Sequence, residues 1–195
     1  ETGRVESAEA HYRASLRLYH ELQNHRMFSI TQGNLANLVK QQGRTEEARQ
    51  LYQHALQGIR EIGDRRAAAN VLGSLGNLHR HQGRLNEAEK CLFEASEIAK
   101  EIGHPFMEAL VGGNLGDVLL EQGRLTEARA SLQGAIQLCQ TEYPKPAGAF
   151  MGSLALIEVQ EGHVEEAWAL LKNGEANLQE GNREELAKLI CKRGR

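Results

Sequence analysis

Apolar side chains recur every three or four residues along most of this chain, separated by polar ones. Between Thr45 and Ile62, for example, Ala48, Tyr52 and Ile59 fall on one face of a helix. The same spacing predicts amphipathic helices from end to end. Their ranges are 5–24, 28–42, 45–62, 65–82, 85–102, 105–122, 125–140, 145–161, 164–179 and 183–193. The pattern therefore predicts an all-helical protein.

Glycine marks the ends of these helices. Gly43, Gly83 and Gly123 each stand between two amphipathic segments, and each is followed by arginine. Glycine just past a helix end adopts the left-handed conformation at little steric cost, so each Gly-Arg pair predicts a helix C-cap followed by a turn. The turns are short, which predicts antiparallel helix hairpins.

The hairpins repeat at a fixed period. Gly33-Asn34-Leu35-Ala36-Asn37-Leu38 is followed by Gly73-Ser74-Leu75-Gly76-Asn77-Leu78 and then by Gly113-Asn114-Leu115-Gly116-Asp117-Val118, and each step is 40 residues (73 − 33 and 113 − 73). Self-similarity at such a period is the signature of a solenoid, in which each unit packs only on its neighbours. We predict one array over 1–195. It consists of a half repeat (1–25), hairpins at 26–64, 65–104, 105–142 and 143–181, and a half repeat (182–195).

Each unit also carries a pattern of small and large residues. In the second unit it reads Leu75, Gly76, Gly83, Ala88, Leu92 and Ala95. The pattern resembles the tetratricopeptide repeat, in which small residues let paired helices approach closely. The 40-residue unit differs from the usual length of about 34 residues. It is similar to the subclass in LGN/Pins-type adaptors, kinesin light chain and bacterial signalling proteins. The resemblance implies a right-handed superhelical solenoid of antiparallel hairpins.

In proteins of that family the first helix of each hairpin lines the concave surface. The lining positions implied for a partner are Asn34, Asn37, Lys40, Asn70, Ser74, Asn77, Arg80, His81, Asn114, Asp117, Glu121 and Ser153. Many of them carry amides or hydroxyls, which both donate and accept hydrogen bonds and so can hold a peptide backbone. The charge is basic early in the set and acidic late, which would orient a partner of opposite pattern. The alternative is that these residues tie repeats together or face water.

Glycine also recurs within the predicted helices, at Gly33, Gly73, Gly113 and Gly152. Each costs about 1 kcal/mol relative to alanine in a helix interior. One interpretation is close packing between helices of the array. The other is a smooth groove that lets a partner's backbone come near.

Composition excludes several classes of function. The chain has 195 residues, a net charge of −3, and 25% charged residues, so it lacks the basic character of a nucleic-acid-binding protein. Three widely separated cysteines fit reduced thiols, and no apolar run would span a bilayer. We expect a cytoplasmic protein that binds neither nucleic acid nor membrane. The chain does not begin with methionine, and it starts and stops at the same point of the repeat, so we expect a longer parent array.

Nothing in the sequence supplies a catalytic nucleophile with a base, and His79 and His81 lie two residues apart without further ligands for a metal. We expect no catalysis, no metal and no cofactor. The predicted function is a scaffold that binds a partner peptide or helix on its concave face. Two alternatives stay open: a regulatory sensor segment of a larger kinase or transcription regulator, and a module that self-associates end to end.

Overall fold

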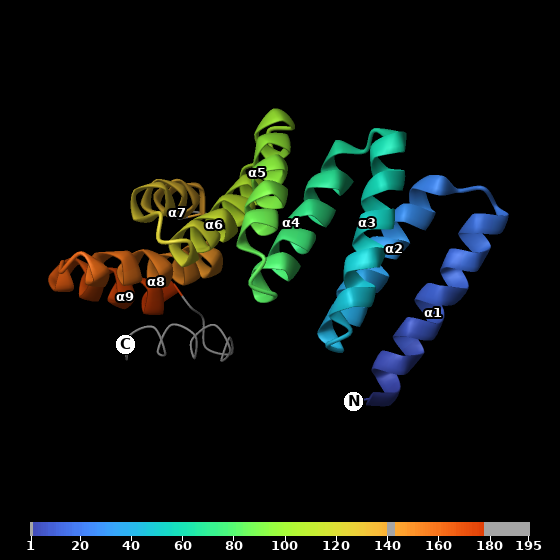
Figure 1. Ribbon diagram of the computed structural model, residues 1–195, viewed down its shortest axis with the longest axis horizontal. Helices are drawn as coiled ribbons and strands as arrows, with labels where there is room; N and C mark the ends of the chain where they lie inside the picture. Colours follow the sequence, from blue (N-terminus) through green and yellow to red (C-terminus); the bar gives the residue numbers. More distant parts are fainter. Residues whose placement is uncertain (1, 140–142, 178–195) are drawn as a thin grey trace. The chain divides into compact units, whose positions relative to one another are not determined.

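The structure is a computed structural model that describes residues 2–139 and 143–177. These residues form α-helices joined by short turns (Figure 1). The chain divides into two compact units, residues 1–98 and 99–195, which are described separately. The expected all-α fold of helix hairpins is confirmed. None of the described helices is both long enough and apolar enough to cross a membrane.

The first unit consists of four helices and most of a fifth. They are α1 (Thr2–Glu21), α2 (His25–Gln41), α3 (Thr45–Ile62), α4 (Arg65–His81) and the greater part of α5 (Leu85–Glu101). α2 and α3 form a closely packed hairpin, and α1 and α4 pack against α2 and α3 respectively. Of the residues predicted to face inward on α3, Ala48, Tyr52, Ala55 and Ile59 are buried, and Leu51 is partly buried.

The turns follow the expected glycine chemistry. Gly43, Gly63, Gly83, Gly103 and Gly123 have φ angles between 62° and 78°, in the left-handed region that favours glycine. The next helix begins at a side-chain cap in two turns of the first unit. Asn24 Oδ1 accepts from the Met27 amide and Asp64 Oδ1 from the Ala67 amide, both at 3.0 Å.

The second unit contains α6 (Pro105–Glu121), α7 (Leu125–Cys139), α8 (Pro144–Gln160) and α9 (Val164–Asn177). Its core includes Leu132, Phe150 and Ile157, and Leu132 and Ile157 are fully buried. Gly116 lets α6 and α7 approach closely, since a Cβ there would lie 2.7 Å from Leu132 Cγ. The predicted helix over 183–193 lies outside the described residues, and the single-array division of the chain stays a prediction.

Candidate functional site

The first unit has a small cavity between α2 and α4. Its volume is about 110 Å³, and residues of both helices line it, with Tyr52 and Ile59 of α3 behind them. Four of the residues predicted from the sequence lie together here: Asn34, Asn37, Asn70 and Ser74. Asn34 and Asn70 are exposed, whereas Asn37 and Ser74 are partly buried. The cavity is therefore an amide- and hydroxyl-lined depression that opens to solvent.

A buried tyrosine fixes the inner part of this cavity. The Tyr52 hydroxyl donates to Asn37 Oδ1 at 2.6 Å, and the Ser74 side chain hydrogen-bonds the same hydroxyl. Burial raises the pKa of Tyr52 to about 12, so the phenol stays protonated and keeps its donor. These bonds join α2, α3 and α4. The Ser74 bond joins α4 to the preceding hairpin, as expected if polar residues tie repeats together, whereas the Asn37 bond lies within the α2–α3 hairpin.

The rest of the predicted set in the first unit lies outside the cavity. Lys40 is partly buried near the end of α2, and burial lowers the pKa of its ammonium group. Arg80 and His81 are in the last turn of α4. Asn77 stands where Asn37 stands forty residues earlier, but position 92 is leucine where position 52 is tyrosine. Its buried Oδ1 accordingly has no hydrogen-bond donor among the described residues.

In the second unit, α6 carries three of the predicted residues. Asn114 and Asp117 are partly buried and Glu121 is exposed, so all three reach the surface. Ser153 of α8 does not, because its side chain is only 1% exposed. The prediction that Ser153 lies on a surface open to a partner is therefore wrong in this structure. Position 153 falls on the buried side of α8, between Met151 and Leu154 in the core.

The recurring mid-helix glycines serve packing. Gly33, Gly73, Gly113 and Gly152 are all buried, and Gly33 also lines the α2–α4 cavity. A Cβ on Gly33 would lie 3.3 Å from Val71 Cγ2, and a Cβ on Gly113 would overlap the Phe150 ring. A large side chain of the next repeat fills the space that glycine leaves. The contacts at Gly33 and Gly113 support the close-packing interpretation, and the groove interpretation stays a prediction at Gly33, which lines the cavity.

Comparison with known families accounts for this arrangement of small and large residues. The MalT-like TPR region, where TPR denotes the tetratricopeptide repeat, matches residues 1–191. This chain belongs to that family. Among curated proteins no sequence matches.

Solved structures share the fold of this MalT-like TPR region. BtubC (BKLC) from P. vanneervenii is 21% identical with a TM-score of 0.82, and the match covers 90% of this chain and 74% of that one. A putative kinesin light chain from Podosopora anserina with nearly identical TPR-like repeats is 19% identical, with a TM-score of 0.71 and coverages of 90% and 88%. A Rap protein complexed with competence and sporulation factor is 17% identical, with a TM-score of 0.81. That match covers 96% of this chain but 53% of the Rap protein, so this TPR region spans about half its length.

Tyr52 is the residue of this site that sequence reasoning missed. Its spacing placed it correctly on the apolar face of α3, but the role of its hydroxyl did not follow from that spacing. The signal was present in the repeat register, since positions 92 and 132 are leucine. A tyrosine in a leucine position needs a partner for its hydroxyl, and the equivalent amide on the neighbouring helix provides one.

The structure of the TPR region also brings together Glu158, Glu161 and His163 at the turn between α8 and α9. One ligand atom of each lies within 4.8 Å of the others. Arg129 Nη2 donates to Glu158 Oε1 at 3.0 Å and to Glu161 Oε2 at 2.5 Å, and this bond lowers the pKa of Glu161. The carboxylates already have a cationic partner, so the group is an ion-pair network between α7 and the α8–α9 turn.

The two histidines considered for metal binding, His79 and His81, lie in different surroundings. His79 is buried, and burial lowers the pKa of its imidazole, whereas His81 is exposed. Two residues apart on a helix, they face different directions, as expected.

Proposed function

We propose that this TPR region is a protein-interaction module that holds an extended peptide segment of a partner along the groove between α2 and α4. The observation that carries the proposal is the solvent-open cavity between these helices, lined by Asn34, Asn37, Asn70 and Ser74. Each side chain both donates and accepts, which matches the alternating N–H and C=O groups of an extended backbone. Backbone recognition of this kind needs no particular partner side chain at these positions.

The contacts within the groove give its residues two roles. Asn37 and Ser74 are held in place by Tyr52, so they present fixed hydrogen-bonding groups and lose little entropy when a partner binds. Asn34 and Asn70 are exposed and have room to adapt to the peptide. The fixed pair sets the position of the backbone, and the exposed pair closes over it.

The comparisons support an interaction role in general terms. The matching family is a repeat region, and TPR folds are typically non-catalytic scaffolds. A Rap protein of the same fold was solved in complex with competence and sporulation factor. The proposal for this chain includes Asn114, Asp117 and Glu121 on α6 as further contacts, with Lys40, Asn77, Arg80 and His81 on α2 and α4. The proposed function does not include catalysis.

Selection of peptides followed by groove mutations tests the proposal. Peptides are selected on the whole chain by phage display, and the affinity of the best one is measured by fluorescence anisotropy. Asn34→Ala combined with Asn70→Ala removes the two exposed amides. We expect at least a tenfold loss, which corresponds to about 1.4 kcal/mol and to one or two hydrogen bonds.

The matched control is Gln133→Ala, which removes an exposed amide from α7 in the second unit. It should leave the affinity unchanged. The circular dichroism spectra of all variants should overlay, since the altered side chains are exposed. Equal affinity of the Asn34/Asn70 double variant and the original chain would show that the groove is not the site.

A further inference from the structure

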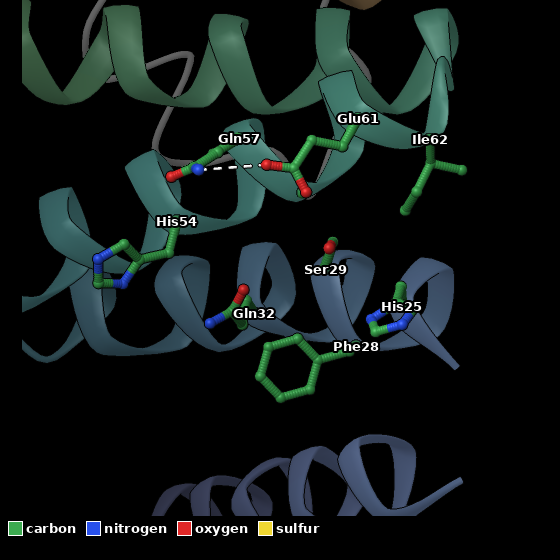
Figure 2. Close-up of a pocket in the computed structure, with 9 residues that line it drawn as sticks. His25, Phe28, Ser29, Gln32, His54, Gln57, Glu61 and Ile62 are labelled. Carbon is green, nitrogen blue, oxygen red and sulfur yellow. Dashed lines mark hydrogen bonds between the residues drawn. The ribbon is translucent and has the colours of Figure 1, made fainter. Parts of the chain in front are cut away.

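A second and larger cavity lies on the α2–α3 hairpin, on a different face of α2 from the first. Its volume is about 520 Å³, within the range of about 300–1,000 Å³ typical of small-molecule sites. Figure 2 shows Phe28, Ser29 and Gln32 of α2 below it and His54, Gln57 and Glu61 of α3 above it. All the lining residues belong to this one hairpin. No residue of the α2–α4 groove takes part, so the two sites are separate.

The cavity arises from three departures from the repeat. Ser29, Gln32 and Gly58 stand where the next repeat has Ala69, Leu72 and Ile98, forty residues on in each case. The three residues of the next repeat are core residues, with exposures of 0%, 2% and 3%. In the α2–α3 hairpin, glycine removes the large aliphatic side chain, and two polar groups replace apolar ones. The first hairpin thus lacks the packing that the next repeat has at these positions.

Ser29 adds a polar side chain to the wall of the cavity. The residue is 3% exposed, but its hydroxyl oxygen is not among the described polar atoms that are buried without a hydrogen-bond partner. The hydroxyl lies where a side chain at position 58 would begin, because a Cβ on Gly58 would overlap Ser29 Oγ. The next repeat has alanine at the equivalent position 69, so its packing does not require a hydroxyl there. A hydroxyl both donates and accepts, so Ser29 offers a hydrogen-bonding group to a ligand in the cavity.

The charge and shape of the walls define the ligand. The carboxylate of Glu61 accepts from Gln57 Nε2 at 3.2 Å, but it pairs with no arginine, lysine or histidine among the described residues. The Phe28 ring and Ile62 supply apolar surface beside it. The uncompensated carboxylate attracts a cation, while the apolar walls bind a hydrocarbon or aromatic body.

We propose that this cavity binds a small organic molecule that carries an ammonium group on an apolar body. The ammonium group pairs with Glu61, and the apolar part packs on Phe28. A hydrogen-bonding group at the inner end reaches the Ser29 hydroxyl. Binding here does not depend on the peptide groove, because the two sites share no residue.

A titration with phenethylamine followed by two-dimensional ¹H–¹⁵N NMR tests the proposal on the whole chain. The amides of Ser29, Gly58 and Glu61 should shift in a saturable manner. The anion 3-phenylpropionate has a similar body and opposite charge, and it should bind at least tenfold more weakly. Absence of saturable shifts at these amides, or equal binding of the anion, would overturn the proposal.

Two variants separate binding in the cavity from attraction to the surface. Glu61→Gln keeps the size and the exposed position of the side chain, and it should weaken the binding of phenethylamine by up to about fivefold, the upper end for one exposed ion pair. Gln137→Ala, at the position equivalent to Gln57 in α7, is the matched control and should change nothing. Unchanged affinity of the Glu61→Gln variant would count against the ammonium pairing.

Filling the cavity gives the strongest test. The triple variant Ser29→Ala, Gln32→Leu and Gly58→Ile installs the residues that the next repeat already packs. We expect a higher melting temperature and loss of the phenethylamine shifts. Retained binding in a folded triple variant would disprove the site. If the triple variant fails to fold, the Glu61→Gln comparison decides alone.

Discussion

The hairpins α2–α3 and α6–α7 follow the same repeat register but differ in what they place inside. In α6–α7, Leu132 packs on Gly116, and Ser131 Oγ donates to the Gly112 carbonyl at 2.9 Å. In α2–α3, the residue equivalent to Leu132 is Tyr52, which bonds to polar side chains on both adjacent helices. The same scaffold thus accepts either an aliphatic seam or a polar network at one position.

The difference has an energetic direction. Burying a large aliphatic side chain contributes about 1.5–3 kcal/mol, and Gly58 gives this up where the next repeat has Ile98. A buried hydrogen bond such as that from Tyr52 contributes only about 1 kcal/mol net. The α2–α3 hairpin therefore gains less stability at these positions than it would with the residues that the next repeat has there. The larger cavity lies wholly on this hairpin, and the smaller one lies between it and α4, so both cavities occur where the packing is weaker.

The largest expected effect comes from alanine at equivalent glycines of the two hairpins. Gly113→Ala places a Cβ inside the Phe150 ring and should destabilise the protein by about 1–3 kcal/mol, as overpacking does. Gly33→Ala places a Cβ 3.3 Å from Val71 Cγ2 and 3.9 Å from Ala55 Cβ; this tight contact opposes the better helix propensity of alanine, so the net change in stability should stay below about 1 kcal/mol. Urea unfolding monitored by circular dichroism measures both.

A second substitution shows whether Phe150 is the cause. Phe150→Ala removes the ring and by itself lowers the stability of the protein. In a chain that already carries Phe150→Ala, the added Gly113→Ala substitution should lower the stability far less than it does in the original chain. Additive effects of the two changes would contradict the contact. Equal losses for Gly33→Ala and Gly113→Ala would contradict the difference between the hairpins.

A smaller effect is expected when the polar network becomes apolar. Tyr52→Phe leaves Asn37 Oδ1 without its donor, the state already found at Asn77, and should cost about 1 kcal/mol. The control is Tyr12→Phe on α1, since the Tyr12 hydroxyl has no hydrogen bond within the described part of the chain. The urea midpoint of the Tyr52 variant should fall while that of the control stays. A midpoint equal to the control's would show that the bond adds nothing.

The fold was predictable because each repeat encodes it locally. The predicted helix over 45–62 is α3 itself, and those over 65–82 and 105–122 end within one residue of α4 and α6. Left-handed glycines at 43, 83 and 123 ended helices where expected. Periodicity and turn chemistry act over a few residues, so the sequence shows them directly.

The site was predictable only in part, since it depends on contacts between helices. The amides at 34, 37 and 70 share a cavity with Ser74, but the tyrosine behind them was classed with the apolar face. Ser153 is buried. The prediction that it faces outward used only its position in the repeat, which did not show which side of α8 is covered. The sequence shows that Gly58 is a small residue at a position where the next repeat has an aliphatic one. That this glycine lies against the Ser29 hydroxyl could be seen only in the structure.

Ion pairs give a last contrast between the units. In the first unit, Glu9 of α1 accepts from Arg13 Nη2 and from Arg44 Nη1, both at 2.8 Å, and from Gln42 Nε2 at 3.1 Å. In the second unit, Arg129 is the centre and Glu158 and Glu161 surround it. One network gathers cations around a carboxylate, and the other gathers carboxylates around a cation.

The smallest expected effect tests the first of these networks through its pH dependence. Hydrogen bonds from Arg13, Arg44 and Gln42 lower the pKa of Glu9 to about 2. Because the folded pKa is below the unfolded value of about 4.3, the stabilisation is fully present above that value and is lost as the pH falls towards 2. Glu9→Gln should cost about 0.5 kcal/mol at pH 7, since the pairs are partly exposed, and less in 1 M salt. At pH 2 the variant and the original chain should differ least in urea midpoint. A difference that stays constant from pH 7 to pH 2 would show that the charge of Glu9 is not what stabilises the α1–α2 contact.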